Sequence, residues 1–533
     1  MALSTFACIL YIGFDVVCDR LVTLSVLDSY EGRWQILKDL TACYKHFPIL
    51  GTGLGTHSVV YPMFQHINTT ALFTHAENEY AQLMEETGLI GLVSLIIFGI
   101  IIWSNYARNL RNDKFPICSA AYGLGLGLLA ILIHSLSDFG QHVPANAFLS
   151  AIFCALLLAL TRIGQNGQQT TQTAIPFWKS ACSVVLRIAV FLVVFGIYTW
   201  SFIGADNERI AESHWSKVLT IEEGLVEKNW QGTDAEYAEL ISYATVASER
   251  QPENIEYRYW LNVYRWYKIS RTTDLISGVF SEDSISTVRD IVNGLHKACR
   301  YCPTFGDTYC TLGQIEKLVL DDDVGGAERI RKGFRLAPCD PIVCLVVGCL
   351  DIEEDKIEQS FEKFKKAVQI DGKLFNGIVD IYINGVDRPD LAVAIAEDNM
   401  GWLSHVANVL ADMEEHKGIV EKAQSRVVEL LREKCSGPNA PASALASLAN
   451  IYRKDKDNEA AIEYYYRALA LDYSQVGWRF VLAKLLAESG KISEAIYEAR
   501  ICLKLRPQLK AAEELIAELS VHPNMLDEEG SNP

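Results

Sequence analysis

The sequence predicts an all-α protein in which a multi-span transmembrane helical bundle is followed by an α-solenoid of paired helices. Long apolar stretches gather in the first third of the chain, and small and apolar residues recur at a spacing of 34 in the remainder. A chain of 533 residues with 50% hydrophobic content exceeds one ordinary core. We therefore place a membrane domain at residues 1–205, a repeat domain at 206–521 and a disordered tail at 522–533.

The membrane domain is predicted from stretches that lack Asp, Glu, Lys and Arg. Four of them are long enough to cross about 30 Å of hydrocarbon as helices, and a shorter one at the start predicts an incomplete or tilted first span. A signal peptide is disfavoured there because no Lys or Arg precedes the apolar run. The predicted spans cover about residues 2–17, 87–107, 115–137, 143–161 and 182–205, with an outer loop at about 18–87.

Charges around the spans predict the orientation of the chain. Lys and Arg follow the second and fourth spans, at Arg108, Arg111, Lys114, Arg162 and Lys179. Such residues mark cytoplasmic loops, so the outer loop and the repeat domain are expected on the opposite side of the bilayer. The net charge of −18 offers no basic stripe for phosphates, which argues against a nucleic-acid partner.

The repeat domain is predicted from pairs of small residues that lie 34 positions apart. Ala461 pairs in this way with Ala495, Ala468 with Cys502, and Cys310 with Cys344. This is the period of tetratricopeptide repeats, which the C-terminal domain resembles, and small residues at these positions let paired helices approach closely. A protein partner for the repeats is expected. Aromatic clusters in the repeats could line a peptide or glycan surface, but core packing is favoured.

Six cysteines crowd into the repeat domain, at Cys299, Cys302, Cys310, Cys339, Cys344 and Cys349. An exported domain permits disulfides, and the Cys299 to Cys302 spacing is compatible with a metal or redox site. Packing is favoured because these residues fall at helix contacts and no His lies at ligand spacing. No metal site or other cofactor is predicted.

The outer loop carries a run of motifs ahead of the second span. An Arg-Trp pair at Arg33 opens a helical pattern, and Pro48 leads into a turn with Gly51, Gly53 and Gly55. Asn78 is then separated by nine residues from Gly88, with Gly91 three further on. The turn lacks the Lys-Ser/Thr of a nucleotide-binding loop, so a structural turn is favoured over a phosphate cradle. Together these elements resemble the O-antigen ligase and polymerase superfamily over about residues 1–163.

The resemblance implies transfer of a glycan from an undecaprenyl-diphosphate carrier to an acceptor hydroxyl, without a metal, on the periplasmic face of a bacterial inner membrane. The implied partners are the lipid bilayer, the lipid-linked glycan and a glycan or lipid acceptor. Such a reaction needs a cation at the diphosphate and a base at the acceptor. Arg33 is the candidate for the first role, because a guanidinium binds phosphate oxygens bidentately. Glu77, which stands where the family motif has His, is the candidate for the second.

Four further residues are expected to support substrate binding. His75 and Asn78 flank Glu77, while His134 and Asp138 lie one helical turn apart at the end of a span. Non-catalytic roles remain open for both candidates. Arg33 could contact solvent or lipid headgroups, and Glu77 could stabilise a helix N-terminus.

Three functional hypotheses follow. The first is a glycosyltransferase of the O-antigen ligase type, and the second is a non-catalytic, membrane-anchored repeat scaffold for polysaccharide or envelope assembly. The third is a related transferase of the same superfamily with a protein acceptor. Glu77 stands at the position of the motif His, and few spans precede the outer loop. Both features leave open the interpretation that the chain is a truncated or inactive member of the superfamily.

Overall fold

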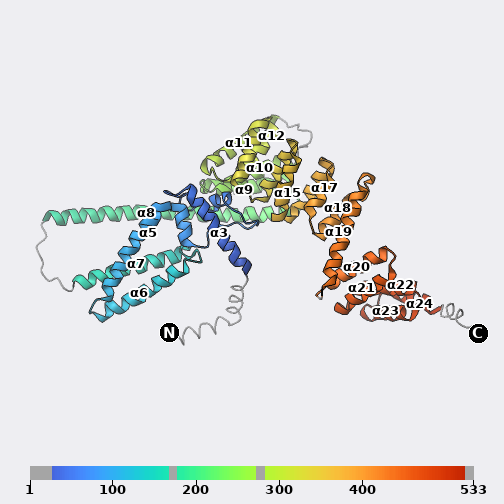
Figure 1. Ribbon diagram of the computed structural model, residues 1–533. Helices are drawn as coiled ribbons and strands as arrows, with labels where there is room; N and C mark the ends of the chain where they lie inside the picture. The colour runs from blue at the N-terminus through green and yellow to red at the C-terminus, as the bar shows by residue number, and fades with distance from the viewer. Residues whose placement is uncertain (1–26, 167–176, 272–281, 438, 522–533) are drawn as a thin grey trace, which may run out of the picture. The chain divides into compact units, whose positions relative to one another are not determined.

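The computed structural model describes residues 27–166, 177–271, 282–437 and 439–521. Across these ranges the regular structure is helical and contains no strand (Figure 1), which confirms the predicted all-α class. Contacts divide the chain into residues 1–372 and 373–533, and each unit is described by itself. The predicted first span at 2–17 and the predicted tail at 522–533 lie outside the described residues.

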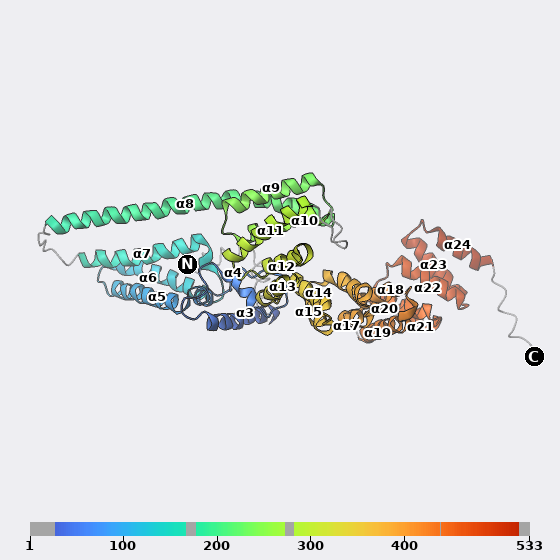
Figure 2. The ribbon, with the colours of Figure 1, turned by 90° about the horizontal axis from the view of Figure 1, so that it is seen from above.

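The apolar stretches of the sequence form long helices in the first unit. These are α5 (Glu79–Leu110), α6 (Phe115–His134), α7 (Pro144–Asn166) and α8 (Phe177–Glu227). By length and composition, each of these described helices could cross a membrane. Helices α5, α6 and α7 pack side by side (Figure 2) around buried Ile102, Ala121 and Leu157. Most of their other apolar side chains remain exposed, as expected for surfaces that lipid covers.

Helix α8 belongs to both predicted domains. Its N-terminal part is apolar and exposed, for example at Phe191 and Val193. Its C-terminal part carries Ala211, Trp215 and Val218, which are buried against α9 (Asp234–Arg250). The helix therefore runs without interruption through residue 205, where the sequence placed the domain boundary.

The first unit continues with antiparallel helix pairs. After α9 come α10 (Ile255–Ser270), α11 (Glu282–Tyr301), α12 (Gly306–Leu320), α13 (Asp323–Leu336), α14 (Pro341–Glu353) and α15 (Ile357–Ile370). Helices α12 and α13 form one pair and α14 and α15 the next, and α13 and α15 begin 34 residues apart. Cys310 and Cys344 occupy equivalent buried positions in these pairs. A Cβ on Gly333 would lie 2.5 Å from the Cys310 Sγ, so this pair needs the small residue.

The second unit begins within the short η3 (Gly372–Leu374). Its helices are α16 (Phe375–Asp380), the π-helical η4 (Ile381–Gly385), α17 (Pro389–Ala396), α18 (Met400–Val409), η5 (Glu414–His416), α19 (Lys417–Ser436), α20 (Ala442–Lys454), α21 (Asn458–Leu471), α22 (Val476–Glu488), α23 (Ile492–Leu505) and α24 (Lys510–Val521). The pairs α20–α21 and α22–α23 repeat at 34 residues. Ala461, Ala468, Ala495 and Cys502, singled out by that spacing, are all fully buried.

The cysteines of the repeats are free thiols in the structure. Cys310, Cys339 and Cys344 are buried, and Cys299, Cys302 and Cys349 are half-buried. Among the described residues no group of His, Cys, Asp and Glu is arranged to hold a metal ion. Burial raises the pKa of the Cys299 and Cys349 thiols to about 11, so both are protonated at neutral pH.

Candidate functional site

The outer segment is built on a helix that packs across the start of α5. Helix α3 (Leu27–His46) buries Ile36, Leu40 and Cys43 along one face, at the spacing of an amphipathic helix. It is followed by the glycine turn, by α4 (His57–Val60) and by η1 (Tyr61–Met63). Asn78 then begins α5, and its side chain accepts a hydrogen bond from the Ala81 N–H at 2.9 Å. The segment thus brings Arg33 of α3 to the beginning of α5.

Helix α5 is broken at Gly88, where φ is +61° and ψ is −155°. A break leaves carbonyls before it and N–H groups after it without helical partners. The glycine turn supplies them: the N–H groups of Thr52 and Gly53 donate to Glu85 and Glu86, each at 2.9 Å. On the other side of the break, the N–H groups of Leu89 and Ile90 donate to Pro48 and Ile49 at 3.0 and 3.3 Å. The turn therefore completes the broken helix.

Gly51 and Gly88 are the positions at which this fit requires glycine. Both have positive φ, of +69° and +61°. Residues that carry a Cβ adopt such a backbone conformation only at an energetic cost. A Cβ on Gly51 would lie 2.4 Å from the Glu86 backbone, and one on Gly88 would lie 2.5 Å from the Ile49 carbonyl oxygen. Four amides of the turn have partners, since the N–H groups of Gly51, Thr52 and Gly53 donate to backbone carbonyls and that of Gly55 donates to the Glu86 carboxylate at 3.0 Å. This arrangement agrees with the structural turn favoured from the sequence.

Arg33 and Glu77, the two predicted catalytic residues, lie together. The Arg33 Nη2 is 3.4 Å from the Glu77 Oε2, and their side chains are 50% and 31% exposed. Glu77 has a φ of +55°, an unusual value for a residue with a side chain. It immediately precedes the N-cap Asn78, so the backbone turn that starts α5 also directs this carboxylate towards α3. The pair is accessible to a ligand.

His75 lies in an aromatic and histidine-rich environment beside this pair in sequence. Its ring stacks on Phe139 at a centroid distance of 4.6 Å and lies 4.8 Å from the ring of His142. Burial, followed by the charges of His142 and His57, lowers the pKa of His75, so the imidazole is neutral at pH 7. Its Nδ1 is buried without a hydrogen-bond partner among the described residues. His75 is therefore a neutral imidazole whose buried Nδ1 has no protein partner in the described part of the chain.

The loop between α6 and α7 is fastened to the start of α5. The Asn78 Nδ2 donates to the Leu136 carbonyl at 2.7 Å, so this predicted substrate-binding residue also joins two helices. Glu79 accepts hydrogen bonds from the Gln141 N–H at 2.6 Å and lies 3.0 Å from the His142 Nδ1. The loop includes η2 (Gly140–His142). These contacts hold His142 against His75.

His134 and Asp138 form a pair of their own. The His134 Nε2 is 3.3 Å from the Asp138 Oδ2, and the imidazole is 63% exposed. In the described part of the chain no ion pair joins them to Arg33 or Glu77. The structure thus brings four of the six predicted residues to the start of α5. The pair flanks Ser135 and Leu136, whose carbonyls accept hydrogen bonds from Glu79 and Asn78 of that start.

Two buried polar networks of the outer segment were not predicted from the sequence. Asp39 is 2% exposed and accepts hydrogen bonds from the Tyr61 hydroxyl at 3.0 Å and the His66 N–H at 3.2 Å. The His57 Nδ1 lies 2.6 Å from the Glu85 Oε2, with both side chains buried. A signal for Asp39 was present, because it falls on the apolar face of α3 between Ile36 and Leu40.

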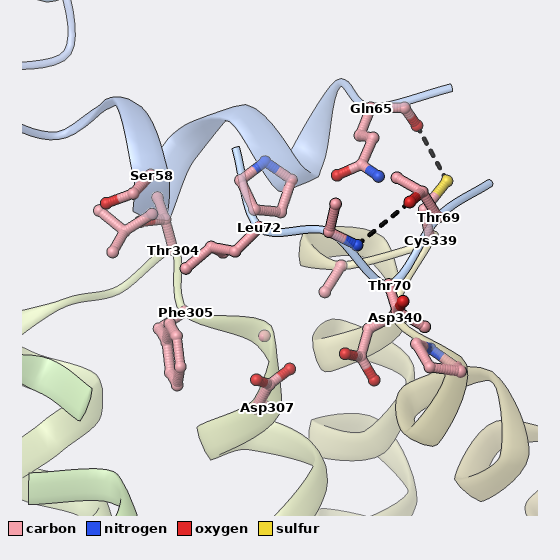
Figure 3. A pocket seen from close by; sticks show the side chains of 16 residues that line it. Ser58, Gln65, Thr69, Thr70, Leu72, Thr304, Phe305, Asp307, Cys339 and Asp340 are labelled. Atoms are coloured by element: carbon pink, nitrogen blue, oxygen red, sulfur yellow. Dashed lines mark hydrogen bonds between the residues drawn. The ribbon is translucent and has the colours of Figure 1, made fainter. Parts of the chain in front are cut away.

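A cavity of about 210 Å³ lies between the outer segment and the repeats of the first unit (Figure 3). Residues of the outer segment from Ser58 to Leu72 face the turns that precede α12 and α14. Asp307 and Asp340 border the cavity, and Cys339 donates through Sγ to the Gln65 carbonyl at 3.1 Å. Burial, with Asp340 and Glu256 nearby, raises the pKa of Asp307 to about 7. None of the predicted site residues borders this cavity.

An apolar groove of about 270 Å³ lies between α5, α6 and α7. Leu83, Phe98 and Trp103 contribute to its walls, and Glu79 and Gln141 lie at its polar end. Glu79 is the residue that fastens His142, so the groove opens beside the candidate site. Such a groove suits a hydrocarbon chain whose polar head lies near α5's first turn.

The fold and site define a multi-span membrane protein with a helical-repeat domain. A family model described as O-antigen ligase matches residues 2–96, so this region is similar to that family, as its motifs predicted. The match contains Arg33, Glu77 and the Gly51 to Gly55 turn. A search of curated proteins finds no match.

Solved structures similar to this chain include tetratricopeptide-repeat proteins. The Cut9–Hcn1 hetero-tetramer of APC/C is 12% identical over 81% of this chain and 74% of that chain, with a TM-score of 0.21. Yeast Tom70 is 13% identical over 81% and 86%, with a TM-score of 0.21. The TPR domain of P58(IPK) is 10% identical over 58% and 97%, with a TM-score of 0.20. The repeat assignment itself rests on the 34-residue period and the paired helices of this chain.

Proposed function

We propose that this protein is a membrane glycosyltransferase of the O-antigen ligase type. It transfers a glycan from an undecaprenyl-diphosphate carrier to an acceptor hydroxyl on the periplasmic face of a bacterial inner membrane. The observation that carries the proposal is the accessible Arg33–Glu77 pair at the start of α5, within the region similar to O-antigen ligases. The cation and the base that the reaction needs are thereby supplied at one place.

In the proposed mechanism Arg33 binds the diphosphate, and its guanidinium stabilises the negative charge that develops on the leaving group. Binding of phosphate draws Arg33 away from Glu77, which frees the carboxylate to accept the proton of the acceptor hydroxyl. The acceptor oxygen then attacks the sugar carbon, and the bond between this carbon and the diphosphate oxygen breaks. His75, which is neutral, accepts a hydrogen bond from a second hydroxyl of the acceptor and so orients the attacking one.

The carrier lipid is proposed to occupy the groove between α5, α6 and α7. Its walls are mainly apolar, and its polar end lies at Glu79 beside His142 and His75. A hydrocarbon chain in this groove would present its diphosphate near the start of α5. His134 and Asp138, exposed at the end of α6, are proposed to contact the glycan. The repeats are proposed to bind a protein partner of polysaccharide assembly.

A test of the catalytic proposal replaces each member of the pair in the full-length protein. Arg33→Ala and Glu77→Gln are each expected to lower attachment of polymer to its acceptor by about 100-fold or more, measured by the amount of linked product. Arg209→Ala removes a comparable exposed arginine, paired with Asp206 on α8, and should leave attachment unchanged. Wild-type attachment by both the Arg33 and the Glu77 variants would remove the catalytic assignment.

A non-catalytic scaffold is the second candidate, and one observation favours it. Arg33 and Glu77 lie within ion-pair distance of each other, so their role could be to join α3 to the start of α5. The exchange of the two charges separates the candidates. Arg33→Glu combined with Glu77→Arg retains an ion pair, and thus a scaffold, but misplaces both catalytic groups. If the double variant restores the polymer attachment that the single variants lose, the scaffold is favoured over the enzyme.

A further inference from the structure

The loop from Phe47 to Leu54 exposes apolar side chains on the outer segment. Ile49, Leu50 and Leu54 are 61%, 73% and 78% exposed, and Phe47 is 37% exposed. They follow one another closely and are not scattered over the surface. Leucine and isoleucine side chains that are this exposed form an apolar patch. Such a patch is expected to be covered by an apolar partner.

The position of the loop identifies that partner as the bilayer. Its Pro48 and Ile49 carbonyls accept hydrogen bonds from the N–H groups of Leu89 and Ile90. These two residues are the first of the exposed apolar face of α5, and their side chains are 48% and 53% exposed. Because backbone hydrogen bonds join the two segments, the loop lies at the depth at which α5 enters the hydrocarbon. The patch is therefore continuous with a surface that lipid covers.

The backbone of the loop is suited to this environment. Polar backbone groups near hydrocarbon need partners within the protein. The N–H of Gly51 donates to the Phe47 carbonyl at 3.2 Å, and those of Thr52 and Gly53 donate to α5. Lys45 and His46, both exposed, end α3 immediately before the loop. Basic residues beside an apolar insertion complement the phosphates of lipid headgroups.

We propose that Phe47, Ile49, Leu50 and Leu54 insert into the outer boundary of the bilayer as a wedge that does not span it. Lys45 lies at the headgroup phosphates above them. The wedge anchors the outer segment at the membrane surface, in addition to the spanning helices. Insertion of the wedge does not require transfer activity, because it involves only contacts between the loop and lipid.

The test uses a photoreactive benzoylphenylalanine at Leu50 or Leu54 in the full-length protein, reconstituted in vesicles of phosphatidylethanolamine and phosphatidylglycerol. Both side chains are exposed, so the substitutions leave the packing of the loop intact. The same group at Ile97, 54% exposed on α5, is the membrane control, and at Leu471, 63% exposed on α21, the control in the repeats. Lipid adducts are counted by mass spectrometry after illumination.

The wedge is expected to give lipid adducts at Leu50 and Leu54 within about threefold of the yield at Ile97, and at least about tenfold above Leu471. Yields at both positions equal to that of Leu471, with strong labelling at Ile97, would overturn the proposal. Adducts to a second copy of the chain or to another protein, in place of lipid, would also overturn it. The two positions are tested separately, so a variant that fails to assemble leaves the other to decide.

Discussion

The outer segment and the helical repeats both bring helices into close contact, but by different means. In the repeats, small side chains such as Gly333 and Ala461 recur every 34 residues and let regular helices approach. In the outer segment, a turn inserts its own backbone into the break of α5 and replaces four missing helical hydrogen bonds. The first solution is periodic and tolerates variation in each unit. The second occurs once and depends on individual atoms.

The largest effect is expected where the turn meets the break. Gly51→Ala places a methyl group within 2.4 Å of the Glu86 backbone and adds strain at positive φ. We expect a loss of about 4 kcal/mol or more in the stability of the outer segment, measured by thermal unfolding or protease resistance in detergent. Gly55→Ala is the matched control, because Gly55 also has positive φ but a Cβ built on it would meet no atom within 4 Å. Equal losses for both would show that close packing is unimportant.

A smaller effect is expected from a buried ion pair of the repeats. The Arg479 Nη1 lies 2.5 Å from the Glu498 Oε2, between α22 and α23, with both side chains about 5% exposed. Glu498→Ala leaves a buried guanidinium without its carboxylate and should destabilise this unit by about 3 kcal/mol in chemical unfolding. The double variant Arg479→Met with Glu498→Leu should recover most of that loss. If it does not, the repeats depend on individual atoms as the outer segment does.

The smallest effect concerns Asp307 at the cavity between outer segment and repeats. Its pKa is raised to about 7, so the folded protein holds this proton more tightly than the unfolded chain. Stability should therefore fall as the pH rises from about 4 to 7, as the carboxyl group ionises in a half-buried site beside Asp340 and Glu256. Asp307→Asn removes this dependence, and its advantage over the wild type should grow to about 1–3 kcal/mol at pH 8. A constant difference across this pH range would contradict the assignment.

The two regions also differ in how far the sequence predicted them. The repeats were accessible because identical positions recur, and the structure buries Cys310, Cys344 and Ala468 as their spacing indicated. The apolar stretches likewise predicted helices long enough to cross a membrane. The continuous α8 was not predicted, because hydropathy changes at residue 205 while helical character does not.

In the outer segment the sequence identified residues but not their contacts. Arg33 and Glu77 were singled out by motif, yet only the positive φ of Glu77 and the start of α5 bring them within 3.4 Å. The His57–Glu85 pair had no sequence signal, since its partners are 28 residues apart and lie in no repeat. The role of Gly88 was equally hidden, because the turn that completes α5 precedes it by more than thirty positions.

The break at Gly88 has a consequence for biogenesis. The N–H groups that open the apolar part of α5 find their acceptors only in a turn that is synthesised earlier. Until that turn docks, these groups must be hydrated, which opposes burial of Leu89 and Ile90 in hydrocarbon. Insertion of this helix is thus coupled to the folding of a segment outside it, and synthesis order provides the partner first.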